Sequence, residues 1–225
     1  LRKTMKIQDG VYWYKEKGMF DANTYVIEDE LTVLIDPGLE KHLALRLKEM
    51  LRDGIDPKDV DLITVTHLHP DHCGATAALK EVSGAQVALH SSQREYLDIM
   101  AEEAPKFFGM DIATNFVLDF VLGARLSIGK TDLEVLHTPG HSPCSICFYA
   151  SDKKILICGD LIFEKGVGRT DLPLGDTEEL KNSIEMVSEL DTELLLPGHG
   201  AMIDGRNNVK RNYDFIKKVY FNPFL

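Results

Sequence analysis

The stretch Thr66-His67-Leu68-His69-Pro70-Asp71-His72 places four metal-binding side chains within six residues. It overlaps the end of an apolar, β-branched run over 61–66 that predicts a strand, and it precedes a predicted helix over 74–82. If the chain stays extended beyond the strand, the first two histidines project to the same side, because side chains alternate along extended backbone. The aspartate and the third histidine then lie on the turn that follows. Such a stretch can contribute ligands to two neighbouring metal ions.

Three further candidate ligands stand at predicted strand ends, each beside a glycine. They are His141 in His137-Thr138-Pro139-Gly140-His141-Ser142, Asp160 in Cys158-Gly159-Asp160, and His199 in Pro197-Gly198-His199-Gly200. Glycine has no Cβ to obstruct a close approach, and loops at the ends of buried strands commonly carry functional groups. Together with the first stretch they make five histidines and two aspartates, enough for two metal sites that share one bridging carboxylate.

Hydrophobic periodicity predicts alternating strands and helices on both sides of these motifs. The pattern predicts strands over 11–14, 23–27, 32–35, 61–66, 86–89, 132–136, 145–149, 154–157 and 193–196. It predicts helices over 39–51, 74–82, 91–103, 177–190 and 208–220, the third capped by Ser91 or Ser92, and it leaves 104–125 ambiguous. Strands that first meander and then alternate with helices, in two similar halves, favour two packed sheets with helices outside. The pattern does not decide the topology within each sheet.

Composition limits the classes of protein that fit. The chain has 225 residues, 44% of them hydrophobic, and we expect one globular domain over 1–225. The formal net charge of −11 would repel phosphate backbones and anionic lipid headgroups, so we expect neither nucleic acid nor a membrane as partner. No apolar run reaches the roughly 18 to 20 residues of a membrane span. Four cysteines are too few for a disulfide scaffold, and no basic segment followed by an apolar stretch opens the chain, so we expect a cytoplasmic protein. The oligomeric state stays open.

The run His67-x-His69-x-Asp71-His72, followed in order by His141, Asp160 and His199, resembles the metallo-β-lactamase superfamily. Within it, the chain is similar to the branch of glyoxalase II (hydroxyacylglutathione hydrolase) and persulfide dioxygenase. Three stretches carry this second resemblance: Asn23-Thr24-Tyr25-Val26-Ile27, the run from His137 to His141, and Gly159-Asp160 together with Gly168-Arg169-Thr170-Asp171. The resemblance implies an α/β fold, a four-layer αβ/βα sandwich of two mixed sheets with helices outside and the metals at one edge.

The resemblance also implies a role for each candidate ligand. His67, His69 and His141 would bind a first metal ion. Asp71, His72 and His199 would bind a second, and Asp160 would bridge the two. Asp36, in Leu34-Ile35-Asp36-Pro37-Gly38, matches a position expected to hydrogen-bond a ligand histidine from outside the cluster.

The implied activity is hydrolysis of a small-molecule thioester or a related substrate, of the hydroxyacylglutathione hydrolase type. Two divalent ions, zinc or else iron, would supply a metal-bound hydroxide that Asp71 orients. A competing hypothesis is a persulfide dioxygenase with one iron, held by His67, His141 and Asp160. A third is a non-catalytic metal-binding protein on the same fold. An aspartate rather than a cysteine at Asp160 argues against the antibiotic-hydrolysing branch.

Two other features allow a structural and a functional interpretation. The apolar residues Phe107, Phe108, Met110, Phe116 and Phe120 either belong to the core or form a wall of the active-site mouth or a dimer contact. Arg169 either pairs with an acidic neighbour such as Asp171 or binds a substrate carboxylate.

Overall fold

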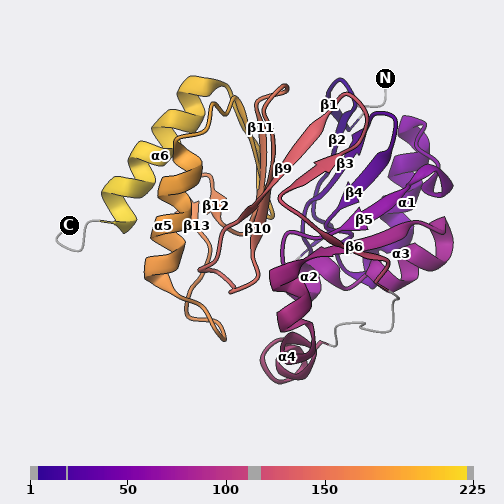
Figure 1. Cartoon of the computed structure of the whole chain (residues 1–225), viewed down its shortest axis with the longest axis horizontal. Coiled ribbons are helices and arrows are strands. Elements are labelled where there is room, and N and C mark those ends of the chain that lie inside the picture. The colour runs from indigo at the N-terminus through magenta and orange to yellow at the C-terminus, as the bar shows by residue number, and fades with distance from the viewer. Residues whose placement is uncertain (1–4, 19, 111–117, 222–225) are drawn as a thin grey trace.

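The structure is a computed structural model that describes residues 5–18, 20–110 and 118–221. Two large mixed β-sheets lie face to face in the centre of the molecule, and helices cover their outer faces (Figure 1). No helix among the described residues is long and apolar enough to span a membrane. The expected four-layer αβ/βα sandwich is confirmed.

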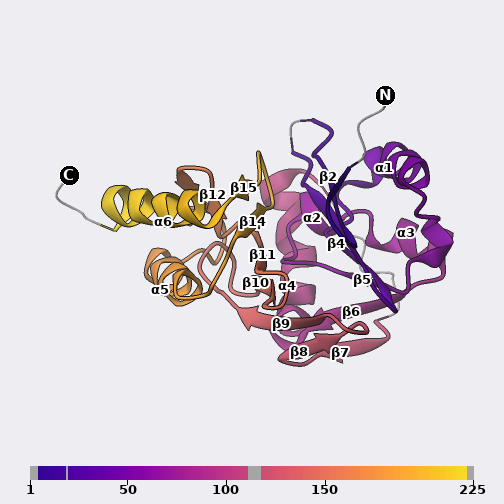
Figure 2. The ribbon, with the colours of Figure 1, turned by 90° about the horizontal axis from the view of Figure 1, so that it is seen from above.

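The first sheet has seven strands in sequence order. They are β1 (Lys6–Gln8), β2 (Val11–Tyr14), β3 (Thr24–Glu28), β4 (Thr32–Ile35), β5 (Leu62–Thr64), β6 (Gln86–His90) and β7 (Phe120–Leu122). Neighbours are antiparallel from β1 to β4 and parallel from β4 to β7. On its outer side lie α1 (Glu40–Asp53), the short 3₁₀ helix η1 (Pro57–Asp59) and α3 (Thr76–Ser83) (Figures 1 and 2). Two more helices, α2 (Pro70–Cys73) and α4 (Ser91–Phe108), lie at one end of this half.

The second sheet has six strands in the order β15-β14-β11-β10-β9-β8. Their bounds are β8 (Arg125–Ser127), β9 (Asp132–His137), β10 (Ile146–Ala150), β11 (Ile155–Gly159), β14 (Leu194–Pro197) and β15 (Ile203–Asp204). Only β11 and β14 pair in parallel. The outer face carries α5 (Thr177–Ser188) and α6 (Arg206–Tyr220), which lie side by side in Figure 2. A small separate hairpin joins β12 (Ile162–Phe163) to β13 (Gly166–Val167).

Alternate residues of the central strands explain the layers. In β4, Val33 and Ile35 pack between the two sheets, whereas Leu34 packs toward the outer helices. In β14, Leu194 and Leu196 point inward and Leu195 points toward α5 and α6. Both faces of such strands are buried, so their sequences are continuous apolar runs and do not alternate between apolar and polar residues.

Most predicted elements are confirmed within one to three residues at each end. Gly54 and Gly84 end α1 and α3 in the left-handed conformation, with φ of 89° and 76°. The predicted cap of α4 is wrong: His90 caps it, and the Gln93 side chain accepts a hydrogen bond from the His90 backbone N–H. The same helix extends to Phe108. The strands absent from the prediction, β1, β7, β8, β12, β13 and β15, have two or three residues each, too few to show a period.

Candidate metal centre

All seven predicted ligands lie at one edge of the sandwich, where loops leave the two sheets. His67 and His69 follow β5, and the short helix α2 carries Asp71 and His72. The other three come from the second half: His141 from the loop between β9 and β10, Asp160 directly after β11, and His199 two residues beyond the end of β14. Because β11 and β14 run parallel, their carboxyl ends lie at the same edge of the sheet, and Asp160 and His199 lie there as well.

Three histidines form the first ligand group. His69 Nδ1 lies 3.0 Å from His67 Nε2 and 2.9 Å from His141 Nε2. All three side chains are buried. A metal ion with nitrogen ligands at 2.0–2.1 Å in tetrahedral geometry holds these nitrogens about 3.3 Å apart. The spacing of the three nitrogens therefore fits a single ion.

Asp71, His72 and His199 form a second group. His199 Nε2 lies 3.2 Å from Asp71 Oδ2, and His72 Nε2 lies 3.9 Å from the same oxygen. The members of this group differ from those of the first, and a third combination of His67, His72 and Asp160 overlaps both, so the ligands surround two adjoining positions.

Asp160 lies between the groups. Its Oδ1 is 3.2 Å from His72 Nε2, and its Oδ2 is 3.5 Å from both His141 Nε2 and His199 Nε2. One carboxylate thus contacts both groups, as a bridging ligand would.

Hydrogen bonds on the far side of the rings fix which histidine nitrogens face the cluster. His72 Nδ1 lies 2.8 Å from Asp36 Oδ2, and a carboxylate only accepts, so Nδ1 carries the proton and Nε2 presents a lone pair inward. Thr66 donates to the same carboxylate through its backbone N–H (2.6 Å) and its hydroxyl (2.8 Å). The predicted contact between Asp36 and a histidine of the cluster is therefore present.

Each of three other histidines also has an oxygen beside its outer nitrogen. The pairs are His67 Nδ1 with Thr66 Oγ1 at 3.2 Å, His141 Nδ1 with the Arg169 carbonyl at 2.7 Å, and His199 Nδ1 with Glu16 Oε2 at 3.3 Å. Donation to these oxygens leaves every Nε2 free to bind a cation.

Two inward-facing atoms have no hydrogen-bond partner among the described residues. They are His72 Nε2 and Asp160 Oδ1, both buried and only 3.2 Å apart. A buried acceptor without a partner is rare and costly, and a divalent cation would satisfy both atoms at once. The donor set of imidazole nitrogens and carboxylate oxygens is one that zinc and iron both accept.

The electrostatics differ between the two groups. Burial lowers the pKa of His69 to about 3, with the neighbouring His141 acting in the same direction, so this ring is neutral at pH 7. Burial alone would also lower the pKa of His199, but hydrogen bonds to Asp160 and Asp71 raise it to about 10. Without metal, His199 in the second group is therefore protonated and hydrogen-bonded to Asp160 and Asp71. A bound dication takes the place of such protons.

Asparagine at position 36 is expected to weaken metal binding by about 10- to 100-fold, because outer hydrogen bonds of this kind hold the ligand in orientation. The amide offers one acceptor oxygen where the carboxylate serves Thr66 and His72 with two. Competition with a chromogenic chelator measures the affinity. Asp152→Asn, in the exposed turn before β11, is the control. Unchanged affinity for both ions in folded Asp36→Asn would contradict this positioning role.

Several residues that hold the His199 loop were not identified from the sequence. The Asn23 side chain donates to the carbonyls of Pro197 (3.0 Å) and Gly200 (3.1 Å), and the Tyr25 hydroxyl donates to Pro197 at 2.7 Å. A Cβ on Gly198 would lie 2.2 Å from Asp160 Oδ1, so only glycine fits there. Asn23 and Tyr25 lie in a stretch that carries the family resemblance, but their contacts are more than 170 residues away along the chain.

A cavity of about 330 Å³ opens onto the cluster. Five cluster residues line it together with Arg169 and five apolar side chains: Phe20, Phe108, Met110, Phe163 and Leu172. Part of the predicted apolar stretch therefore walls the mouth. Phe107 and Phe120 lie outside this cavity and are exposed, and Phe116 lies outside the described residues. Arg169 pairs with Asp171 through two hydrogen bonds of 2.9 and 2.8 Å.

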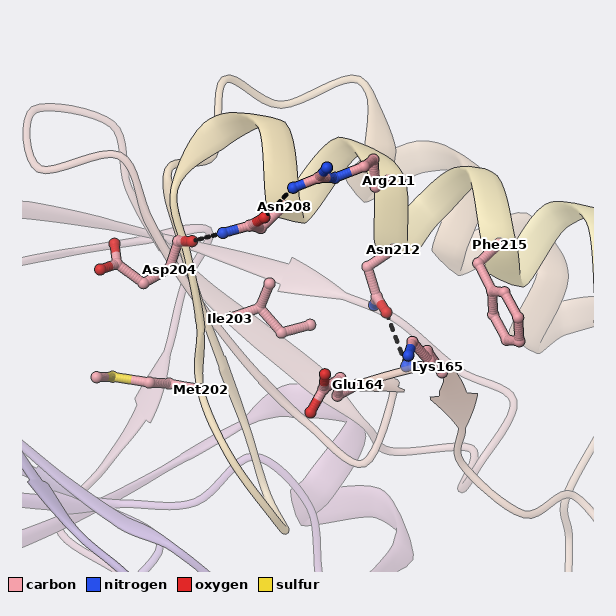
Figure 3. Close-up of a pocket in the computed structure, with 9 residues that line it drawn as sticks. All are labelled: Glu164, Lys165, Met202, Ile203, Asp204, Asn208, Arg211, Asn212 and Phe215. Carbon is pink, nitrogen blue, oxygen red and sulfur yellow. Dashed lines mark hydrogen bonds between the residues drawn. The ribbon is translucent and has the colours of Figure 1, made fainter.

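A larger cavity of about 450 Å³ lies between α6 and the loops around β12 and β15 (Figure 3). Its walls include Arg211, whose guanidinium donates to Asn208, and Asn212, whose side chain accepts from the Lys165 backbone N–H at 2.7 Å. None of the seven predicted ligands lines it. The smaller cavity is therefore the candidate active site.

Comparisons with known proteins show the family of the chain. A model of the metallo-β-lactamase superfamily matches residues 18–199. The probable metallo-hydrolase YqgX of Bacillus subtilis is 34% identical over 193 residues, which cover 83% of this chain and 89% of that protein. The hydroxyacylglutathione hydrolase GloC of Haemophilus influenzae is 33% identical over 191 residues, 81% of this chain and 87% of that protein.

Two solved structures share both fold and sequence similarity. BLEG-1, described as a B3 metallo-β-lactamase, is 29% identical with a TM-score of 0.76 and covers 96% of this chain and 99% of its own. TTHA1623, described in a di-iron-bound form, is 31% identical with a TM-score of 0.73 and covers 93% of this chain and 98% of its own.

Proposed function

The chain belongs to the metallo-β-lactamase superfamily, and we propose that it is a dinuclear metallohydrolase that cleaves thioesters, like a hydroxyacylglutathione hydrolase. The relatives named metallo-hydrolase and hydroxyacylglutathione hydrolase, at 34% and 33% identity, support the proposal. So does the cavity, which leads a small molecule directly to the cluster.

One observation carries the proposal: the ligands include two groups with no member in common, and Asp160 contacts both. His67, His69 and His141 would hold one ion. Asp71, His72 and His199 would hold the other, with Asp160 shared between them. Two divalent ions held by these residues would supply a water of lowered pKa, about 7, and positive charge for the thioester carbonyl and the departing thiolate.

The residues of this chain position the reactants. The Asp71 side chain is 20% exposed and lines the cavity, whereas that of Asp160 is 11% exposed. Asp71 is thus placed to accept a hydrogen bond from the attacking water and to direct its lone pair at the carbonyl carbon. Asp36, through His72, keeps the second group in place. Phe108 and Phe163 line the cavity beside the two ligand groups.

A mononuclear iron dioxygenase is the second candidate. If iron were held by His67, His141 and Asp160, Asp71 and His199 would bind no metal. These two side chains nevertheless lie 3.2 Å apart, beside Asp160. The hydrogen bond that Asp36 accepts from His72 would likewise orient a histidine with no ion. The two-group geometry therefore favours the dinuclear hydrolase.

Removing the metal is expected to abolish thioester hydrolysis, with a fall in kcat of about 100-fold or more, since metal ions supply several kcal/mol of transition-state stabilisation. Thiol release from S-lactoylglutathione, followed with a thiol reagent, measures the activity before and after dialysis against a chelator. Two equivalents of zinc or iron should restore it.

The metal-loaded protein is then assayed for hydrolysis of a β-lactam, because the chain is similar to BLEG-1. Oxygen uptake with a glutathione persulfide is measured in an oxygen electrode. Turnover of either substrate by the metal-loaded protein, without thioester hydrolysis, would contradict the proposed function.

A further inference from the structure

Two aromatic rings flank the metal cluster, one from each half of the molecule. The Phe108 ring, at the end of α4, lies 5.0 Å from the His69 ring between centroids, beside the first ligand group. The Phe163 ring, in β12, lies 6.1 Å from the His199 ring, beside the second group. Both rings line the cavity that opens onto the cluster, so a ligand that reaches the cluster enters beside them.

Three other described residues of the wall are apolar as well. Phe20, Met110 and Leu172 line the cavity, and Phe20 is 64% exposed. An apolar ligand group that enters would remove this exposed surface from water, which is favourable.

Beside the two rings, the described residues offer no unpaired side-chain cation to an anionic ligand group. Arg169 is the one arginine or lysine among the described residues that line the cavity, and Asp171 already binds its guanidinium through two hydrogen bonds. Asp71 and Asp160 also line the cavity, and the metal ions proposed there would offset their negative charge. A ligand carboxylate against Phe108 and Phe163 would lose its hydration and find no unpaired protein cation.

We infer that the acyl group this cavity accepts is apolar and carries no carboxylate, with aromatic or branched aliphatic groups preferred, an inference that rests on the proposed thioester hydrolysis. The acyl group sits between Phe108 and Phe163 while its carbonyl meets the cluster. This makes the two phenylalanines the specificity-determining residues of the site.

The test compares three thioesters of one neutral thiol, N-acetylcysteamine, with the metal-loaded protein. Phenylacetyl is expected to exceed acetyl and succinyl by about 10- to 100-fold in kcat/KM, the factor for burying one phenyl group. Phe108→Ala and Phe163→Ala should each lower the phenylacetyl-to-acetyl ratio about tenfold. Phe107→Ala, in the same helix but outside the cavity and 59% exposed, is the matched control and should keep the ratio.

Binding of the product acids provides a readout that does not depend on turnover. By calorimetry, phenylacetate should bind the metal-loaded protein about tenfold more tightly than acetate or succinate, and Phe108→Ala should remove this difference. If thioesters are hydrolysed without acyl preference, the inference is overturned while the proposed function stands. If none is hydrolysed, the proposed function fails, and the ratio of phenylacetate to acetate affinity decides the inference alone.

A preference for succinyl that Arg169→Ala abolishes would also overturn the inference, because it would show that Arg169 leaves Asp171 to bind a substrate carboxylate. We expect instead that Arg169→Ala keeps the order of the three substrates.

Discussion

Replacing Asp160 with alanine is expected to lower the metal content below one ion per chain and kcat/KM by about 1,000-fold, because metal ions contribute several kcal/mol to the transition state and each 1.4 kcal/mol is a factor of ten. Asp160 contacts His72 with one oxygen and His141 and His199 with the other, so its loss removes a ligand from both positions. Elemental analysis and thioester hydrolysis are measured on the same sample.

The control for this variant is Asp152→Ala, an exposed aspartate in the turn before β11, the strand that Asp160 follows. It should keep full metal content and activity. Circular dichroism establishes that both variants are folded. An Asp160→Ala protein with two ions and unchanged hydrolysis would refute the bridging assignment.

Replacing Arg46 with methionine is expected to destabilise the fold by about 3–5 kcal/mol, the cost of leaving one member of a buried ion pair alone. The Arg46 guanidinium in α1 donates to Asp21 Oδ2 at 2.9 Å, and neither side chain has exposed surface. It also donates to the carbonyls of Pro37 (2.9 Å) and Ala22 (3.0 Å). Urea unfolding at constant metal concentration measures the change.

Two further variants separate the ion pair from general effects of the substitution. Arg52→Met, an exposed arginine in the last turn of the same helix, should change the free energy of unfolding by less than about 0.5 kcal/mol. The double variant Asp21→Asn/Arg46→Met should recover part of the loss, since no charge stays buried without a partner. A loss below about 1 kcal/mol in Arg46→Met would show that the pair does not stabilise this region.

The ligands of the candidate metal centre could be predicted because they stand in short local patterns that follow strands. His67, His69, Asp71 and His72 follow a β-branched run, and His199 follows a run of leucines next to glycine. The strands themselves were predictable where they are buried on both faces, as β4 and β14 are, since their apolar runs are continuous.

The residues that hold those ligands could not be predicted, because their partners are distant in sequence. Glu16 reaches His199 across 183 residues, and Asp21 reaches Arg46 across 25. Nothing in the local pattern around Arg46, on an otherwise amphipathic helix, distinguishes a buried arginine from an exposed one. The cavity walls show the same limit: Phe107 and Phe108 are adjacent, yet only Phe108 lines the site.

The most direct test of the dinuclear centre is the metal content of the protein produced in medium with both zinc and iron, and purified without chelators or a histidine tag. Elemental analysis should give about two divalent ions per chain, zinc or iron or a mixture, in agreement with the two ligand groups that Asp160 joins. About one iron per chain with little zinc would contradict the dinuclear hydrolase and favour the mononuclear dioxygenase, and a folded protein that binds no metal would contradict both.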